Sequence, residues 1–543
     1  MWGACGCCLC ALHETSGGHL PFKRSLELRL MTKNSFFRRT APLGRALAIA
    51  ALLNASTDAL GNNLQMGAPT VNTGASTITF TISWANSWFV TGGPANWDGV
   101  WLFVKRQSCS DRLWNHALLS TVDGDHAVTG GLLTVDAVAD GMGVFVHRTN
   151  PGQGDIPTST VTLRLQTAPN NVDNFRVFGI EMVNIPQGEF LIGDGGQSCG
   201  NTSFCSQLIT ATTQANGIGA AANYVCISPN WGSSGNLPAT FPLGFNRFYA
   251  MKYEVSQEQY VGFLNCLTFT QQVARTHLPP NSAVGGYAMV VSSPISRNGI
   301  RIAVSGLPNS DPAVYGCDLN ANGTMNDADD GQNVACNWLG WRDLAAYLDW
   351  AALRPITEFE YEKLCRGTAA VAAFGEYAWS NLMLTQVSSA SLLNAGQAGE
   401  VPTTTGPGLC AAGWNNSGTL GPLRCGFAAT GATLRVASGS GFYGVMDLTG
   451  NVWEQCIGGN NGSNYGTFTA ASGDGSLAAN GNANTTGWPA NGGANNGSMV
   501  RGGAWNTDAV GASNRGYVAC AGGFITLGAG RDRGVGGRGG RSW

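Results

Sequence analysis

The stretch Leu353-Arg-Pro-Ile-Thr-Glu-Phe-Glu-Tyr-Glu-Lys363 contains the start of a helix. Thr357 is placed to cap this helix and Glu360 stands at its third position, so the two are expected to form a capping box. Three further motifs lie apart from it in the chain: Tyr249-Ala-Met-Lys-Tyr-Glu-Val-Ser256, Tyr443-Gly-Val-Met-Asp-Leu-Thr-Gly-Asn-Val-Trp-Glu454 and Val500-Arg-Gly-Gly-Ala-Trp505. The order and spacing of all four motifs can be compared with those of known families, so a family prediction does not depend on any single motif.

In that order and spacing the four motifs resemble the formylglycine-generating-enzyme (sulfatase-modifying factor) family. The resemblance covers about residues 181–543. It implies an α+β fold of the C-type-lectin kind, with few helices, short sheets and much irregular structure stabilised by calcium. Helical spacing of apolar residues agrees with this at two further places, directly after Ser256 and over residues 341–352.

A separate all-β unit is predicted before this region. Apolar and polar residues alternate over residues 78–84, which places one face of a strand in a core and the other in water. Three more strands are expected over residues 100–104, 143–146 and 160–165. Strands at this spacing, without helical pattern between them, are typical of a small Ig-like β-sandwich, here over residues 62–170.

The composition excludes a disordered chain. Charged residues make up 12% of the 543 residues, whereas 43% are apolar and 16 are Trp, so there is enough apolar surface to build cores. This length predicts about two or three domains. The net charge of −3 gives no reason to expect nucleic acid or an acidic membrane surface as a partner.

Residues 1–60 are expected to be a targeting segment. From Met31, basic residues precede the apolar stretch 46–53, and small residues follow as far as Ala59. This pattern predicts a bacterial export signal over about residues 31–59, with an apolar stretch too short to span a bilayer. The protein is therefore expected to be secreted or held at the cell surface. Residues 1–30, which contain four cysteines, are either an upstream mis-start or a zinc-binding cluster.

Of the 16 cysteines, the twelve after this segment are expected to form disulfides in an exported protein, except Cys520, which lies inside the suspected variable segment. Three pairs are close enough in sequence to be local staples: Cys199 with Cys205, Cys317 with Cys336, and Cys410 with Cys425. The connectivity as a whole stays open, because spacing does not determine it.

The tail from Asn506 to Arg541 contains no Lys, Glu, Gln, Met or Trp. These are the five residue types that a codon ending in C cannot encode, and composition alone predicts roughly four of them in such a stretch. Asn codons mutated at their adenines would give residues of the kind present here. The alternative is a Gly-rich coil that lacks long side chains by chance.

Within the resembled family, variable proteins of diversity-generating retroelements carry their mutable residues after an R-G-G-x-W motif, and this chain is similar to that subgroup. The resemblance places the variable region at about 501–541, with Arg501, Trp505, Arg538 and Arg541 as fixed framework. The residues expected to form the outward-facing, ligand-binding surface are Asn506, Thr507, Asp508, Val510, Gly511, Gly516, Tyr517, Val518, Cys520, Phe524, Ile525, Leu527, Arg531, Asp532 and Val535.

No catalytic residues are expected. Formylglycine generators of the family use a pair of copper-binding cysteines shortly after the R-G-G motif, whereas residues 505–512 contain none and Cys520 stands alone. The iron-dependent relatives need several histidines, and His277 is the single one after residue 150. The Arg- and Gly-rich ending, residues 531–541, could alternatively bind RNA, but it lacks interleaved aromatic residues.

A calcium loop is predicted between residues 318 and 329. Oxygen-bearing side chains occupy positions 1, 3, 5, 9 and 12, with a glycine at position 6 and a backbone carbonyl at position 7. The predicted ligands are Asp318, Asn320, Asn322, Thr324, Asn326 and Asp329. The alternative is that these residues form an Asn- and Asp-rich turn and no calcium site. The resemblance implies further Ca²⁺ ligands at Gly450, Asn451, Val452 and Glu454, and at Asn394.

These features together predict an exported, calcium-stabilised binding protein with a diversified surface. Its expected partner is a protein or glycan on another cell or a virus, with no nucleic acid and no membrane-spanning segment involved. The alternative is a divergent enzyme of the same fold.

Overall fold

The computed structural model of the chain describes residues 63–193, 207–212, 240–293, 295–368, 375–387, 389–413, 421–430, 433–458, 467–492, 497–507 and 530–543. The expected targeting segment, the Cys199 and Cys205 pair, and residues 508–529 of the variable region lie outside the described residues. Strands predominate and helices are few, in agreement with an α+β fold. No described helix is long and apolar enough to cross a membrane.

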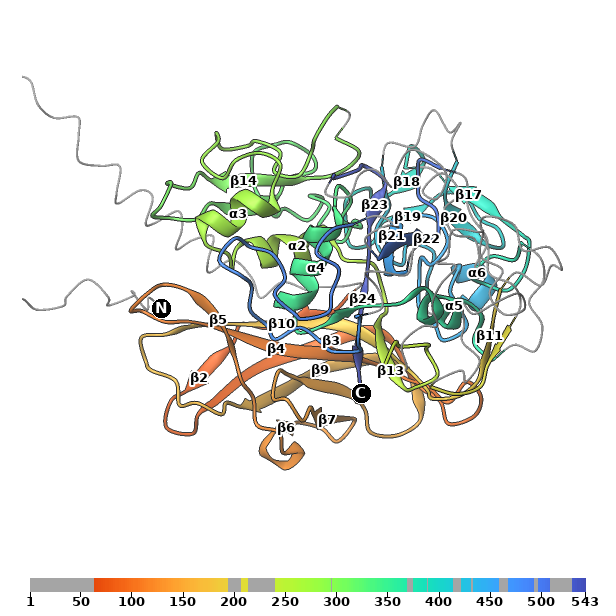
Figure 1. Cartoon of the computed structure of the whole chain (residues 1–543), viewed down its shortest axis with the longest axis horizontal. Helices are drawn as coiled ribbons and strands as arrows, with labels where there is room; N and C mark the ends of the chain where they lie inside the picture. The colour runs from red at the N-terminus through yellow and green to blue at the C-terminus, as the bar shows by residue number, and fades with distance from the viewer. Residues whose placement is uncertain are drawn as a thin grey trace, which may run out of the picture.

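Two sheets form the lower half of the molecule in Figure 1. The smaller sheet has the order β1-β3-β9-β6, with β2 also paired to β3; its strands are β1 (Gln65–Met66), β2 (Thr70–Asn72), β3 (Thr77–Phe89), β6 (Ala127–Val128) and β9 (Gly152–Arg164). The larger sheet has the order β16-β24-β13-β10-β4-β8-β7, with β5 also paired to β4; its strands are β4 (Asp98–Gln107), β5 (Trp114–Ala117), β7 (Leu133–Ala137), β8 (Val144–Arg148), β10 (Asn174–Ile185), β13 (Phe248–Met251), β16 (Arg354–Pro355) and β24 (Gly539–Ser542).

Strand β4 is covered on both faces, which explains its continuous apolar run. Val100, Leu102 and Val104 point into the core between the two sheets. Trp101 and Phe103 point the other way, into a second core that includes residues of the helices. Successive side chains lie on opposite faces of a sheet, so alternate residues of β4 pack into two different cores.

The prediction of a self-contained Ig-like sandwich over residues 62–170 is not confirmed. Strand β10 pairs with β4 from Asn174 opposite Gln107 to Val183 opposite Asp98, and its other edge pairs with β13. One sheet therefore continues from the predicted sandwich into the region 181–543. The expected boundary between the two falls inside β10, whose hydrogen bonds tie the regions together.

Five α-helices are described: α2 (Gln257–Leu264), α3 (Phe269–Arg275), α4 (Trp341–Trp350), α5 (Glu358–Arg366) and α6 (Arg435–Ser438), with a short 3₁₀ helix η1 (Asp123–Asp125). Helices α2 and α4 lie above the larger sheet in Figure 1 and bury apolar faces against it. The capping box of Thr357 and Glu360 is confirmed, and Ser256 caps α2 in the same way. Helix α3 was not predicted, although Thr268 and Gln271 carry the same signature.

The remaining strands form small sheets in the upper half. Strand β11 (Phe190–Ile192) pairs with β12 (Gln207–Ile209), β14 (Ile300–Val304) with β15 (Val314–Cys317), β17 (Thr385–Val387) with β20 (Leu409–Ala411), and β18 (Leu392–Leu393) with β19 (Val401–Pro402). The last sheet has the order β22-β21-β23, formed by β22 (Ser498–Arg501), β21 (Trp453–Ile457) and β23 (Val535–Gly536).

Two of the predicted disulfide staples are wrong. Cys317, Cys336, Cys410 and Cys425 are buried, and neither pair is joined by a disulfide. The Cys410 thiol donates to the carbonyl of Thr449 at 3.1 Å and the Cys425 thiol lies 3.5 Å from the carbonyl of Glu254, so each is engaged in its own surroundings. Burial raises the pKa of both thiols, which keeps them protonated.

Candidate functional site

The two described segments on either side of residues 508–529 pair with opposite edges of one strand. Strand β22 pairs antiparallel with β21 on one edge, and β23 pairs parallel with β21 on the other. We call residues 498–507 and 530–536 the stems of the tail. They meet directly, since the indole Nε1 of Trp505 donates to the carbonyl of Arg533 at 3.0 Å. The backbone N–H of Trp453 in β21 donates to the carbonyl of Gly534 at 2.8 Å.

Buried arginines fasten these stems to the rest of the fold. Arg501 of the R-G-G motif reaches Glu362 at 2.7 Å and Glu358 at 3.3 Å, both on α5. The second stem is continued by Arg538, whose guanidinium contacts both carboxylate oxygens of Glu454 at 2.5 and 2.6 Å. Motifs far apart in the sequence are thus joined by ion pairs. Breaking such a buried pair leaves an uncompensated charge.

The predicted framework residues Arg501, Trp505, Arg538 and Arg541 are all buried. Arg541 donates to Asp140 and to the carbonyl of Ala352, which joins the C-terminal strand to the loop before β8.

Four residues predicted for the outward-facing surface instead belong to the stems. Thr507 is buried and its hydroxyl accepts the N–H of Ala504 at 3.0 Å. Arg531 contacts Asp343 at 2.9 Å and the carbonyl of Ala274 at 3.0 Å.

The other two are held as closely. Asp532 accepts the N–H of Gly534 at 2.8 Å, and Val535 lies half-buried in β23. Asn506 is half-buried at the end of the first stem. The burial of Thr507 contradicts its predicted outward-facing place. Arg531, Asp532 and Val535 are half-buried in the second stem, and their part in ligand binding stays a prediction. The ten remaining predicted residues lie outside the described part of the chain: Asp508, Val510, Gly511, Gly516, Tyr517, Val518, Cys520, Phe524, Ile525 and Leu527.

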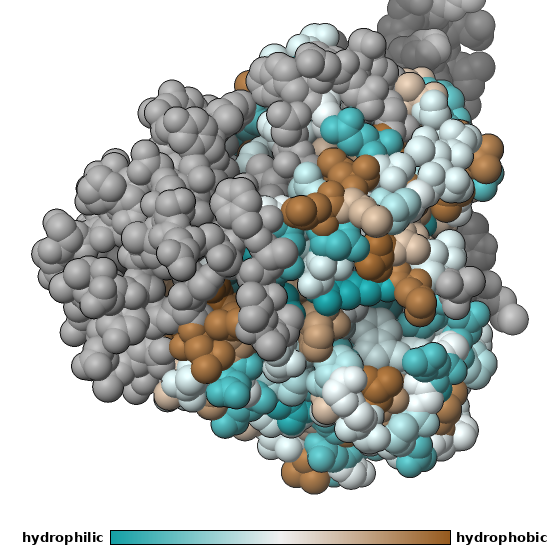
Figure 2. Space-filling view, turned by 90° about the vertical axis from the view of Figure 1, so that its right-hand side faces the viewer, coloured by the Kyte–Doolittle hydropathy of each residue, from teal (hydrophilic) through white to brown (hydrophobic). Residues whose placement is uncertain are grey.

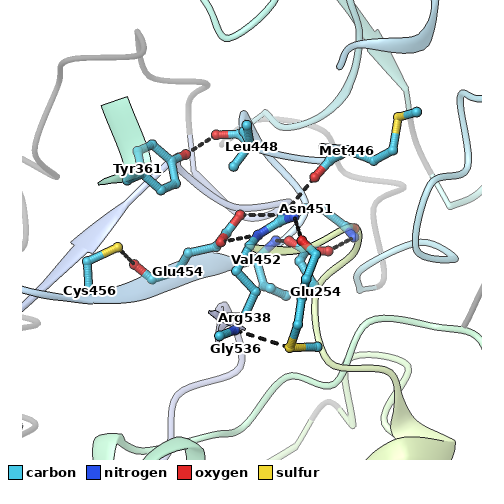
Figure 3. Close-up of polar contacts among 12 residues, drawn as sticks. Glu254, Tyr361, Met446, Leu448, Asn451, Val452, Glu454, Cys456, Gly536 and Arg538 are labelled. Atoms are coloured by element: carbon cyan, nitrogen blue, oxygen red, sulfur yellow. Dashed lines mark hydrogen bonds and ion pairs between the residues drawn. The ribbon is translucent and has the colours of Figure 1, made fainter. Parts of the chain in front are cut away.

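The G-N-x-W-E motif forms a closed polar network, drawn in Figure 3. The Asn451 side chain donates to Glu254 at 2.5 Å and accepts the N–H of Leu423 at 2.8 Å. Glu254 also accepts the N–H of Val452 at 3.1 Å. Asn451 has a φ of 62°, a left-handed conformation that Asn tolerates better than most residues. Glu254 belongs to the motif of residues 249–256, but it was not predicted to be a site residue.

The resemblance implied a calcium site formed by carbonyls of Gly450, Asn451 and Val452 and by the Glu454 carboxylate, and this carboxylate is already paired with Arg538. Both carboxylate oxygens of Glu454 are taken by the Arg538 guanidinium, and the Asn451 side chain is taken by Glu254 and Leu423. Burial is the main cause that raises the pKa of Glu454, and Arg538 opposes it. The positive charge beside Glu454 is therefore supplied by the Arg538 guanidinium.

The predicted calcium loop follows β15 and is largely held by its own side chains. Asp318 is buried and its Oδ2 accepts the N–H of Gly323 at 3.3 Å. Asn320 donates to Asp329 at 2.9 Å. Asn322 donates in the same way to Asp327 at 3.2 Å, and its oxygen accepts the N–H of Thr324.

One predicted ligand turns away from this loop. The oxygen of Asn326 accepts the N–H of Cys317 at 2.9 Å. Asn326 has a φ of 66° and also donates its N–H to the Cys317 carbonyl. The Asn326 side chain thus lies at the β15 end of the loop, away from the other predicted ligands.

A fourth carboxylate, Asp330, was missed by the sequence reasoning. It is buried, and its Oδ2 accepts the N–H of Asp327 at 2.7 Å. Burial, with the nearby carboxylates of Asp318, Asp327 and Asp329, raises the pKa of Asp330 to about 6. The spacing of a twelve-position loop ended the prediction at Asp329, one residue too early.

The loop around Asn394 lies against the end of this acidic loop. Gly331 donates its N–H to the carbonyl of Gly396 at 2.9 Å. Gly396 has a φ of +79°, and a Cβ atom there would lie 2.3 Å from the Asp329 carbonyl oxygen. The Asn394 side chain itself is exposed and donates to the carbonyl of Gly399 at 3.3 Å. Two of the predicted metal-binding segments are thus neighbours.

Within the described ranges, no three His, Cys, Asp or Glu side chains are arranged to hold a metal ion by themselves. A cation at the acidic loop would therefore need amide or carbonyl oxygens as well as carboxylates.

Comparison with known proteins identifies one family. The family model described as "Sulfatase-modifying factor enzyme 1-like domain" matches residues 174–523, which is more than half of the chain. The match begins at the first residue of β10, where the larger sheet passes from the N-terminal strands to the rest of the fold. No curated protein matches the chain.

Proposed function

The chain belongs to the sulfatase-modifying factor enzyme 1-like family, whose domain has a C-type-lectin-like fold, and we propose that it is an exported binding protein that displays a diversified segment. The proposed display segment is residues 508–529, between the two stems. Its partner would be a protein or glycan on another cell or a virus.

The observation that carries this proposal is the anchoring on both sides of the segment. Thr507 before it and Arg531 after it are held by hydrogen bonds and an ion pair. The stems also contact each other through Trp505 and Arg533. Residues in close-packed surroundings cannot be exchanged freely, since even one methylene change is felt. A fixed pair of stems allows the sequence between them to vary without loss of the fold.

The amino-acid composition supports the same segment. Residues 508–529 contain none of the five types that a codon ending in C cannot encode. Tyr517, Phe524, Ile525 and Leu527 are aromatic or apolar, the kinds of residue that supply most binding energy in protein interfaces.

Figure 2 shows how hydrophobic and hydrophilic residues are distributed over one face of the molecule. In the coloured part of Figure 2, hydrophobic residues form small groups among hydrophilic ones. Scattered apolar residues of this kind are usual on folded proteins.

A divergent enzyme of the family is the second candidate, and it rests on family membership alone. The sequence after Trp505 lacks the thiol pair of the copper-dependent members. The described cysteines apart from Cys109 are buried, and burial raises the pKa of Cys365 to about 12, which disfavours the thiolate that binds copper.

Sequencing the gene from many cells of one population tests the proposal. Substitutions should concentrate in the codons of residues 508–529, at the first two codon positions. The codons of the stems should stay constant, including those of Trp505, Thr507 and Arg531. An even spread of substitutions over stems and segment would refute diversification.

A further inference from the structure

We propose that the acidic loop of residues 318–330 binds calcium, with the carboxylates of Asp318 and Asp330 as its two buried ligands. This proposal is independent of the display function. It also changes the ligand set expected from sequence, because it adds Asp330 and removes Asn326.

The first argument is that each of these carboxylates has one oxygen without a partner. Oδ1 of Asp318 and Oδ1 of Asp330 are buried and have no hydrogen-bond partner among the residues that the structure describes. The second oxygen of each accepts a backbone N–H, from Gly323 and Asp327 respectively. Leaving a charged oxygen buried and unpaired is costly. A bound cation removes that cost.

The second argument is the charge around the loop. The carboxylates of Asp318, Asp327 and Asp329 act together on that of Asp330. Among the described residues, the ion pair found at these four carboxylates is that of Asp318 with Arg301, at 3.5 Å. Arg301 also stacks on the Tyr287 ring at 4.0 Å and donates to its hydroxyl. One shared arginine cannot balance four carboxylates, so the loop keeps an excess of negative charge.

The third argument is the chemistry of the remaining donors. Apart from the four carboxylates, the loop offers the amide oxygens of Asn320 and Asn322 and the backbone carbonyl of Thr324. Oxygen-only sets of mixed type suit a hard cation. Calcium accepts six to eight such ligands in irregular geometry, whereas Mg²⁺ demands a near-ideal octahedron. Gly323, with a φ of +87°, makes the sharp turn that brings these groups around.

The existing contacts give a reason why the loop closes without an ion. The amide nitrogens of Asn320 and Asn322 donate to Asp329 and Asp327. We infer that a cation takes over these carboxylates and that each amide turns its oxygen inward. Because Gly331 is hydrogen-bonded to Gly396, binding would also stiffen the contact with residues 394–400.

Calorimetric titration of the calcium-stripped full chain with CaCl₂, together with thermal unfolding in chelator and in calcium, tests the proposal. The wild type should bind one ion at this loop and unfold at a higher temperature in calcium, since an ion bound to the native state alone stabilises it. The double variant Asp318→Asn, Asp330→Asn should lose that binding and that shift. Each Asn keeps an oxygen that can accept the same backbone N–H.

Two comparisons keep the test decisive. The exposed Asp111→Asn is the matched control and should behave as the wild type. In chelator, the single variant Asp330→Asn should be at least as stable as the wild type, because it removes repulsion among the carboxylates and keeps the pair of Asp318 with Arg301. Unchanged calcium binding in the double variant, or no binding by the wild type, would overturn the proposal. An Asp330→Asn variant that is less stable than the wild type in chelator would count against it as well.

Discussion

The indole Nε1 of Trp505 donates a hydrogen bond to the backbone carbonyl of Arg533 at 3.0 Å. This bond joins the two stems at the base of the tail, and the rest of the Trp505 ring packs with Leu423 and Phe427. Trp505 of the R-G-G-x-W motif thus fixes the position of the first stem relative to the second.

Replacing Trp505 by Phe should weaken this junction. Phe keeps an aromatic ring in the cluster but removes one of the two donors to the Arg533 carbonyl, the other being the Asn337 side chain at 2.8 Å. Unfolding should therefore become easier by about 0.5–1.5 kcal/mol, the usual contribution of one hydrogen bond. Chemical denaturation measures the change. The exposed Trp543→Phe is a matched control and should shift the midpoint much less. Equal shifts would mean that the junction contributes nothing specific.

The pair formed by Arg538 and Glu454 should be costly to break from one side. Arg538→Met should lower the unfolding free energy by about 3–5 kcal/mol, because it leaves a buried carboxylate uncompensated. The double variant Arg538→Met, Glu454→Gln should recover part of that loss. Arg112→Met, at an exposed ion pair with Asp311, is expected to cost no more than about 1 kcal/mol. A double variant no more stable than Arg538→Met would contradict this account.

A buried lysine should make stability depend on pH. Lys105 donates to the carbonyls of Trp350 and Gly475, both at 2.6 Å, and burial lowers the pKa of its ammonium to about 7. Between pH 7 and the ordinary lysine value of about 10.4, the folded state binds fewer protons than the unfolded chain. Unfolding free energy should therefore rise with pH in this window, by up to about 1.4 kcal/mol per pH unit from this group.

Denaturation of the wild type and of Lys105→Met at several pH values from 7 to 10 measures that slope. Other groups titrate in both proteins, so the difference between the two slopes isolates Lys105. The wild type should gain stability relative to the variant as pH rises. Parallel curves would show that the Lys105 pKa is not lowered.

The purified protein is expected to lack formylglycine-generating activity, because no cysteine pair follows Trp505. A Cys-containing sulfatase peptide incubated with the protein, copper and oxygen should keep its thiol, as followed by mass spectrometry. Copper-dependent conversion of that cysteine to an aldehyde would overturn the assignment to the non-catalytic members.

Local patterns in the sequence predicted many of the elements correctly. Helix α5 was predicted because its capping box uses residues three positions apart, and β3 because alternation is visible within one strand. The pairing of β10 with β4 could not be predicted this way, since it joins residues roughly seventy positions apart and has no local signature. The merged sheet was missed for that reason.

In the candidate site too, local patterns could be predicted from the sequence, whereas contacts between distant residues could not. Ion pairs such as Arg501 with Glu362 explain why the motifs exist, yet no spacing rule connects residues 139 positions apart. Thr507 and Arg531 were predicted as display residues because amino-acid composition does not distinguish a stem from the segment it supports. Asp330 was missed because the loop template ended at Asp329.

The central claim, that a replaceable segment stands on a fixed pair of stems, is tested most directly by comparing unfolding free energies. The triple variant Tyr517→Asn, Phe524→Asn, Leu527→Asn should stay within about 0.5 kcal/mol of the wild type, as surface substitutions usually do. Arg531→Ala, in the second stem, should cost clearly more, because the buried Asp343 loses the nearer of its two arginine partners and the Ala274 carbonyl loses its donor. A loss of several kcal/mol in the triple variant, the scale of emptied core positions, would contradict the account.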